Sequence, residues 1–380
     1  MKEIGLSLGA EIGRQINIYT PYEKTDTVIA PKLRVRALQS RFSSLNIGST
    51  AYSLIKKAYY SRTFSRFLLR AIKTSGSPFV DKMARLFVKD GVEAIQAEQD
   101  FSLPLALKLG KSLGLPVIAD LHNITAEELV ATGVLKPESA VYFAFQKSMK
   151  EWLTSVDFVC VVSKEMKNYV EVKYELPSHK ILVVPPGGRL RINNPPRKAG
   201  SKVIFAGSIS YREHVDLYVK SLPLVKEEVP EAIFYSTNRG EDLTKMKSLC
   251  NELDVQMKWT WFSDEEYLLS FLCKCAVGVL PSSSDVARVM GTPIKLFDYM
   301  SAGLPVVANR VGGWSELIEE ENIGTLTNDD PKDFALAIIR LLEDEDLRTK
   351  LSHNATKAVR EKYNWKRSVE PLAKFYENLS

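Results

Sequence analysis

The feature that most constrains the fold is a repeated alternation between short apolar runs and longer segments with helical periodicity. In the first half of the chain we expect strands at 16–21, 92–98, 115–122, 157–163 and 180–186, and helices at 102–114, 141–156 and 164–174. Strands that alternate with helices in this way are typical of a parallel sheet with helices on both faces.

The alternation stops once and then starts again. Residues 185–201 contain four prolines and three glycines, which indicates a hinge. After it we expect strands at 202–208, 231–237, 256–262, 276–282, 305–308 and 323–327, and helices at 213–229, 241–253, 264–275, 331–344 and 345–363. The sequence therefore predicts an α/β protein with two doubly wound Rossmann-like domains, 1–184 and 201–363, a hinge at 185–200, and a C-terminal helix at 364–380 that packs back on the first domain. Sheets of this type bind ligands at the carboxyl ends of their strands.

Charge is unevenly distributed over the 380 residues. The net charge is +5, yet residues 27–80 contain ten basic residues and no acidic one, so 41 basic and 46 acidic residues remain elsewhere. Arg62, Arg66 and Arg70 recur every four residues and share one face of an expected helix. This face predicts an anionic partner, either a membrane surface or a phosphorylated or lipid-linked acceptor, unless it is only a solvated helix face. The segment carries no recognised nucleic-acid-binding motif, and no nucleic-acid partner is expected.

The cysteines and histidines give no sign of a disulfide framework or a metal site. The four cysteines lie in or beside apolar segments, and neither they nor the four histidines show the spacing of a metal site. No apolar run approaches the ~18 residues that a membrane span needs. We expect a cytoplasmic protein, either free or peripheral at the inner face of the membrane.

The stretch from Gly291 to Gly313 suggests an anion site. Thr292 is expected to be the N-cap of a helix with Pro293 at its first position, and Gly303 is expected to end that helix in the left-handed conformation. Such a helix start offers free backbone N–H groups and a partial positive charge. Lys295 and Asp298 would lie exposed on its first turns, where they form either part of a site or an ordinary surface pair.

Several segments together resemble the family 4 glycosyltransferases, which are retaining enzymes of the GT-B fold. The resemblance rests on residues 205–235, 277–284, 291–318 and 363–379 in the second half, and on residues 119–129 and 157–170 in the first. It implies transfer of a sugar from a nucleoside diphosphate sugar to a glycan or other hydroxyl acceptor, with two domains facing a cleft. No other cofactor is implied, and without an Asp-x-Asp beside a strand no metal is expected.

The resemblance also implies roles for matching residues. Lys295 would neutralise phosphate, Asp298 would accept hydrogen bonds from the ribose, and His122 would contact the sugar or position the acceptor, unless it is a capping or core histidine. Trp261 lies near the expected position of the base, where it either stacks on it or belongs to the core. The other residues expected at the donor are Gly207, Ser208, Arg288, Met290, Gly291, Thr292, Pro293, Ile294, Gly312, Gly313 and Glu316.

Two positions depart from the family pattern. Met290 replaces a glutamate that binds sugar hydroxyls, with Arg288 nearby. Glu213 stands where a phosphate-binding lysine is expected, with Arg212 as a candidate substitute. These departures favour one alternative to the transferase, a catalytically degenerate protein that binds nucleotide sugars. A nucleotide-sugar epimerase is a second alternative, but its reaction needs a cluster of acids around the sugar, and Met290 removes one of the candidates.

The start of the chain is also expected to be unusual. Residues 2–15 align with the helix that usually follows the first strand of the family, and 16–21 align with the second strand. The first domain is therefore expected to lack its first strand, either because the true start lies upstream or because the chain is a shortened form.

Overall fold

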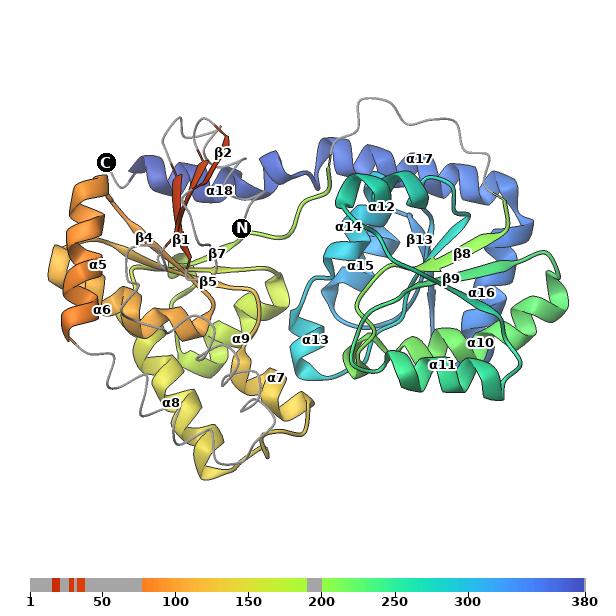
Figure 1. The fold of residues 1–380 in the computed structure, drawn as a ribbon, viewed down its shortest axis with the longest axis horizontal. Helices are drawn as coiled ribbons and strands as arrows, with labels where there is room; N and C mark the ends of the chain where they lie inside the picture. Colours follow the sequence, from red (N-terminus) through yellow and green to blue (C-terminus); the bar gives the residue numbers. More distant parts are fainter. Residues whose placement is uncertain (1–15, 21–26, 31–32, 38–76, 190–199, 379–380) are drawn as a thin grey trace. The chain divides into compact units, whose positions relative to one another are not determined.

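The computed structural model describes residues 16–20, 27–30, 33–37, 77–189 and 200–378 (Figure 1). The chain forms two compact units, Met1–Val184 together with Val369–Ser380, and Pro185–Ser368. In the described residues both units contain a parallel sheet flanked by helices, and the predicted α/β class is confirmed.

The main sheet of the first unit has four parallel strands in the order β4-β5-β6-β7. These strands are β4 Ile95–Glu98, β5 Val117–Leu121, β6 Phe158–Val161 and β7 Ile181–Val183. The helices of this unit are α5 Ser77–Asp90, α6 Leu103–Leu113, α7 Thr125–Ala131, α8 Ala140–Ser155 and α9 Lys164–Tyr174, with short turns η1 Asp100–Ser102 and η2 Ser178–Lys180.

The C-terminal helix α18, Trp365–Asn378, completes the first unit's core. Its residues Val369, Leu372 and Ala373 are buried against Ile118 and Cys160 of the main sheet. The apolar residues of this helix therefore cover one face of a sheet formed by a much earlier part of the chain.

A second, smaller sheet belongs to the same unit and has the order β1-β3-β2. Its strands are β1 Ile16–Thr20, β2 Thr27–Ala30 and β3 Leu33–Ala37. β1 pairs in parallel with β3, and β2 pairs with β3 in antiparallel orientation. The strand expected at 16–21 is confirmed, but its partner β3 lies in the basic segment and was not expected. The helix expected before it lies outside the described residues.

The second unit contains six parallel strands in the order β10-β9-β8-β11-β12-β13. The strands are β8 Lys202–Phe205, β9 Ile233–Thr237, β10 Met257–Thr260, β11 Val277–Leu280, β12 Val306–Asn309 and β13 Gly324–Thr327. The helices are α10 Val215–Glu228, α11 Leu243–Glu252, α12 Glu265–Leu272, α13 Val286–Met290, α14 Ile294–Ser301, α15 Gly313–Glu320, α16 Pro331–Glu343 and α17 Glu345–Glu361, with a short turn η3 Tyr211–Glu213.

Two apolar cores lie on opposite faces of this sheet. Val203 of β8 belongs to the core shared with α10, α11 and α16, whereas the next residue, Ile204, belongs to the core shared with α12, α14, α15 and α17. Side chains of a strand alternate between its two faces, so a strand covered on both sides is apolar throughout. This explains why continuous apolar runs predicted the strands of this unit.

Candidate functional site

The strand order of the second unit contains a switch point between β8 and β11. From β8 the chain first adds strands on one side, β9 and β10, and then adds β11, β12 and β13 on the other. The loops after β8 and β11 therefore leave the carboxyl edge in different directions, and such a switch point is where doubly wound sheets bind ligands. The predicted donor residues follow the carboxyl ends of four strands of this sheet: Gly207, Ser208 and Arg212 after β8, Trp261 after β10, residues 288–298 after β11, and Gly312, Gly313 and Glu316 after β12.

Helix α14 begins at Ile294, and Pro293 is its N-cap. The prediction that Thr292 caps the helix is wrong. Pro293 has φ −72° and ψ 116°, so its backbone is still extended, and the first helical residue is the next one. The helix ends as expected, since Gly303 adopts φ +61°.

Lys295 is a mostly buried residue with a buried partner. Its Nζ forms an ion pair with the Glu213 carboxylate, and Arg288 Nη2 lies 3.4 Å from the same Glu213 oxygen. The three side chains are 11%, 13% and 16% exposed for Lys295, Glu213 and Arg288. The expectation that Lys295 lies exposed at the helix start is wrong, because its side chain runs along the Phe205 ring, with Nζ 5.1 Å from the ring centroid.

This arrangement sets the charge of the cluster. Burial raises the pKa of Glu213, but Lys295, Arg288 and Arg212 together outweigh burial and lower it, so the carboxylate is ionised. Burial lowers the pKa of Lys295, and Arg288 lowers it further, against the opposing effect of Glu213. Cations therefore outnumber the carboxylate in this cluster, which favours an anionic ligand.

Asp298 lies one turn further along α14 and is also largely covered. Burial raises its pKa to about 6, against the opposing charges of Arg189 and Lys295. The expectation that Asp298 is exposed is therefore also wrong.

Gly207 makes room for Lys295. A Cβ at this position would lie 2.5 Å from Lys295 Cε and 2.9 Å from Phe205 Cζ. Its carbonyl oxygen accepts a hydrogen bond from Thr237 Oγ1 at the end of β9. The backbone of the β8 loop is also held by helix α14, since Tyr299 Oη accepts a hydrogen bond from Ala206 N at 2.8 Å. The neighbouring Ser208 is exposed.

Two residues that the sequence did not indicate hold Arg288 in place. Asn309, at the end of β12, accepts a hydrogen bond from Ser282 N at 2.9 Å and donates one to Ser282 O at 2.7 Å. Ser282 Oγ in turn accepts from Arg288 Nε at 3.1 Å. The sequence offers one weak signal for these two residues. Each is a polar residue at the end of a buried apolar run, where a strand reaches the carboxyl edge of the sheet.

The remaining donor residues differ in their surroundings. Met290 is buried at the end of α13, and Glu316 is exposed on the first turn of α15. Gly312, with φ +63°, approaches Val289 so closely that a Cβ would lie 2.7 Å from its carbonyl oxygen. Trp261 is 60% exposed and free to stack on a flat ligand, whereas Trp259 packs against the core.

The first unit contains a candidate site residue, His122, at the carboxyl edge of β5. His122 Nε2 lies 3.4 Å from Asp120 Oδ1. The other Asp120 oxygen accepts a hydrogen bond from Gln96 Nε2 at 2.6 Å, and Gln96 Oε1 accepts one from Tyr376 Oη at 2.8 Å. Burial lowers the pKa of His122, but the hydrogen bond and charge of Asp120 outweigh it and raise the pKa above its usual value.

The helix that follows His122 is fixed by buried carboxylates. Asp100 accepts hydrogen bonds from Thr125 N at 3.0 Å and Thr125 Oγ1 at 2.7 Å, which caps the start of α7 from a separate loop. Burial raises the pKa of Asp100 to about 6, although these hydrogen bonds oppose it. Glu127 accepts hydrogen bonds from Tyr142, Gln146 and Tyr169, all on one oxygen. Helix α7 was not predicted from the sequence, and neither was this network.

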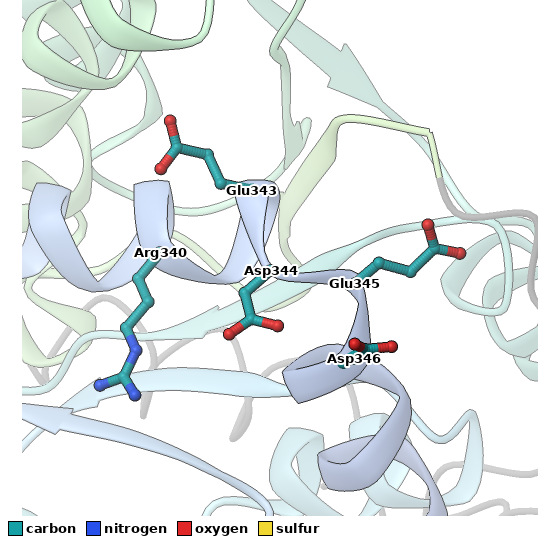
Figure 2. A pocket seen from close by; sticks show the side chains of 5 residues that line it. All are labelled: Arg340, Glu343, Asp344, Glu345 and Asp346. Atoms are coloured by element: carbon teal, nitrogen blue, oxygen red, sulfur yellow. The ribbon is translucent and has the colours of Figure 1, made fainter.

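A hollow at the turn between α16 and α17 is a poor candidate for the same ligand. It is lined by Arg340 and by the acidic residues Glu343, Asp344, Glu345 and Asp346, whose side chains point in different directions (Figure 2). Helix α16 starts after the carboxyl end of β13 and runs back along the sheet, so this turn lies at the opposite edge from Lys295. Four carboxylates would also repel a phosphate.

Arg62, Arg66 and Arg70 lie outside the described residues, and their grouping stays a prediction. In the described parts of the chain, no helix is long and apolar enough to cross a membrane. The same parts contain no group of three His, Cys, Asp or Glu side chains arranged to hold a metal ion.

Comparison with known proteins identifies the family. The model of glycosyl transferases group 1 matches residues 189–358, and the model of glycosyltransferase family 4 matches residues 27–188. The chain belongs to the family 4 glycosyltransferases, and its fold is GT-B. The resemblance seen in the sequence is thereby confirmed.

Individual proteins agree with this assignment. An uncharacterized glycosyltransferase of Methanocaldococcus jannaschii is 24% identical over 375 residues, which cover 96% of this chain and 97% of the relative. Another from that organism is 26% identical over 178 residues, which cover 46% of this chain and 44% of the relative. Sucrose-phosphate synthase of Thermosynechococcus elongatus has a similar structure, with a TM-score of 0.74, 19% identity and coverage of 100% of this chain and 92% of that one. HepE of Anabaena in complex with UDP-glucose gives a TM-score of 0.65 at 14% identity, over 79% and 82% of the two chains.

Proposed function

We propose that this protein transfers a sugar from a nucleoside diphosphate sugar to a hydroxyl acceptor, with retention of anomeric configuration and without a divalent metal. The observation that carries the proposal is the buried pair of cations, Lys295 and Arg288, at the switch point of the second sheet. A phosphate-bearing ligand is the natural partner of two cations at the start of a helix. The UDP-glucose bound by a structural neighbour supports the same class of donor.

The chemistry follows from the charges. The bond between C1 of the sugar and the diphosphate oxygen breaks, a bond from C1 to the acceptor oxygen forms, and the acceptor loses its proton. Negative charge then grows on the leaving diphosphate, where Lys295 and Arg288 stabilise it together with the N–H groups at the start of α14. Because these groups supply positive charge, the proposed reaction needs no metal ion.

His122, in the proposed role, contacts the sugar or the acceptor. Asp120 keeps its imidazole protonated to a higher pH than usual, so the ring can donate hydrogen bonds to hydroxyl groups. A sugar hydroxyl is an acceptor for such a donor. The first unit thus contributes a hydrogen-bond donor at the carboxyl edge of its own sheet.

The test is turnover with a panel of nucleoside diphosphate sugars and hydroxyl acceptors, in the presence of a chelator. Formation of glycoside with the same anomeric configuration as the donor is the expected result. Loss of all turnover in chelator would refute metal independence, and the opposite anomer would refute retention.

We further propose an acceptor carried on an anionic membrane surface, since the net positive charge of the chain is concentrated in residues 27–80. Sedimentation with vesicles tests it. Wild type should pellet with anionic vesicles and remain in solution with neutral ones, and exchanging Arg62, Arg66 and Arg70 for glutamine should abolish the difference. Equal pelleting with both lipids would end this proposal.

A degenerate protein that only binds nucleotide sugars is the second candidate, favoured by Met290 and Glu213. Both residues are buried or nearly so and stand where the family carries other side chains. Tight binding of a donor without transfer or hydrolysis would favour this candidate.

A further inference from the structure

Glu213 is a mostly covered carboxylate that faces two cations of the candidate donor site. It ends the turn η3, one residue before the N-cap of α10, His214, and its carboxylate lies between Lys295 Nζ and Arg288 Nη2. Since all three side chains are mostly covered, the carboxylate compensates charges that water cannot reach well.

The Glu213 carboxylate compensates the charge of Arg288 only in part. Arg288 Nη2 is buried and makes no hydrogen bond in the described chain, and its distance of 3.4 Å from the carboxylate is longer than a charge-assisted hydrogen bond. One carboxylate oxygen cannot meet both cations at hydrogen-bond distance here. Each phosphate of a nucleotide sugar has two non-bridging oxygens, so the diphosphate can serve two donors that lie apart.

Lys295 has little freedom to move away. Its methylene chain fills the space above Gly207, where even a Cβ would lie 2.5 Å from Cε, and its Nζ lies over the Phe205 ring. Glu213, in contrast, lies in a short turn between a loop and the start of α10. An entering anion is attracted by the two cations and repels the carboxylate, so the carboxylate is the group that gives way.

We propose that Glu213 is a built-in competitor for the donor diphosphate. In the empty protein its carboxylate occupies the anion position, and the donor binds by taking Lys295 and Arg288 from it. The two cations then pair with the two negative charges of a nucleoside diphosphate sugar in place of the single charge of Glu213. This inference rests on the proposed function, and it makes Glu213 a residue that lowers affinity for the donor.

The experiment measures binding of inorganic pyrophosphate and of UDP by calorimetry, with wild type, Glu213→Gln and the control Glu175→Gln. Glu175 forms an exposed ion pair with Lys150 in the first unit, at 2.7 Å. Glu213→Gln should bind both ligands about tenfold more tightly, as expected when a competing charge is removed. Glu175→Gln should bind them as wild type does, and binding of the neutral nucleoside should not change in either variant.

Unpaired cations will lower the melting temperature of Glu213→Gln, and pyrophosphate should raise it by more than it raises that of wild type. If the glutamine variant does not fold, Glu213→Asp gives the same comparison, because the shorter side chain competes less well and binding should again tighten. Equal or weaker binding in the variants, with wild type still binding UDP, would overturn this inference and leave the proposed function intact. If no form of the protein bound pyrophosphate or UDP, both would fall.

Discussion

Tyr376, in the last helix of the chain, donates a hydrogen bond of 2.8 Å to Gln96, which lies 280 residues earlier on β4. Gln96 Nε2 in turn donates a hydrogen bond to Asp120, whose other carboxylate oxygen lies 3.4 Å from His122 Nε2. The C-terminal helix thus supports the side chain that orients the first unit's candidate site, although Tyr376 itself is remote from His122 in sequence.

Asp120→Asn should lower the pKa of His122, because it removes the carboxylate that raises it against the effect of burial. NMR titration of the histidine rings measures this shift, and the His122 signal is assigned by its loss in His122→Gln. Tyr376→Phe should leave the Asp120 charge in place and shift the pKa by less. An unchanged His122 pKa in Asp120→Asn would show that the 3.4 Å contact has no electrostatic weight.

Sequence predicted the strands far better than the site. Strands buried on both faces give continuous apolar runs, and each predicted run of the second unit became a strand. Helices α7, α13 and α15 were missed because they have only seven, five and eight residues, which leaves little room for an apolar period. Helix α5 was also missed, although its fourteen residues allow such a period. Strands β2 and β3 were missed because they have only four and five residues, and so short a run gives little periodic signal.

The surroundings of the predicted site residues could not be predicted from the sequence. Lys295 and Asp298 occupy the first turns of a helix, and such positions are usually exposed. The burial of Lys295 depends on Glu213 of the η3 turn and on Phe205 of β8, which come from a separate part of the chain. Likewise, Glu213 could be read only as a departure from the family, since its pairing with Lys295 spans 82 residues.

Glu127→Ala should destabilise the protein by several kcal/mol. The change leaves the hydroxyls of Tyr142 and Tyr169 and the amide of Gln146 without their shared acceptor, and each buried unpaired donor costs about 1–3 kcal/mol. Urea unfolding gives the free energy of unfolding. Glu151→Ala, at an exposed position of α8, is the control and should change it little. Similar stabilities of the two variants would contradict the assigned network.

Lys295→Met should abolish most of the activity while keeping the apolar contact with Phe205. Loss of a cation at the leaving diphosphate is expected to cost about 2–4 kcal/mol of transition-state stabilisation, measured from kcat/KM. Lys362→Met removes an exposed lysine paired with Glu321 and serves as the control, with kinetics close to wild type. Wild-type kinetics in Lys295→Met would refute its placement at the phosphate.

Gly207→Ala should weaken donor binding by displacing Lys295. The new methyl group would lie 2.5 Å from Lys295 Cε and cannot be accommodated without movement of that side chain or of Phe205. Overpacking of this kind costs about 1–3 kcal/mol of stability. Gly200→Ala offers a matched comparison, because a Cβ there meets nothing within 4 Å. We expect KM for the donor to rise in Gly207→Ala alone, and equal KM values would show that Lys295 tolerates the displacement.

Donor affinity should fall as the pH drops through about 6, because Asp298 titrates there. Burial raises the pKa of this carboxyl to about 6, so it is ionised at neutral pH and accepts hydrogen bonds from ribose hydroxyls, as proposed, but loses that capacity when protonated. The effect on stability has the opposite sign. A folded-state pKa above the unfolded value of 3.8 means that the folded state binds the proton more tightly, so the stabilisation is present in acid and is lost as the pH rises through about 6.

The variant Asp298→Asn tests the prediction on affinity. It should bind the donor more weakly at neutral pH, and its affinity should no longer change between about pH 5 and pH 8 through titration of this side chain. Calorimetry with UDP across that range checks the prediction, and Asp346→Asn, at an exposed position of α17, should keep the wild-type profile. A profile in Asp298→Asn that still falls below pH 6 as in wild type would assign the titration to another group.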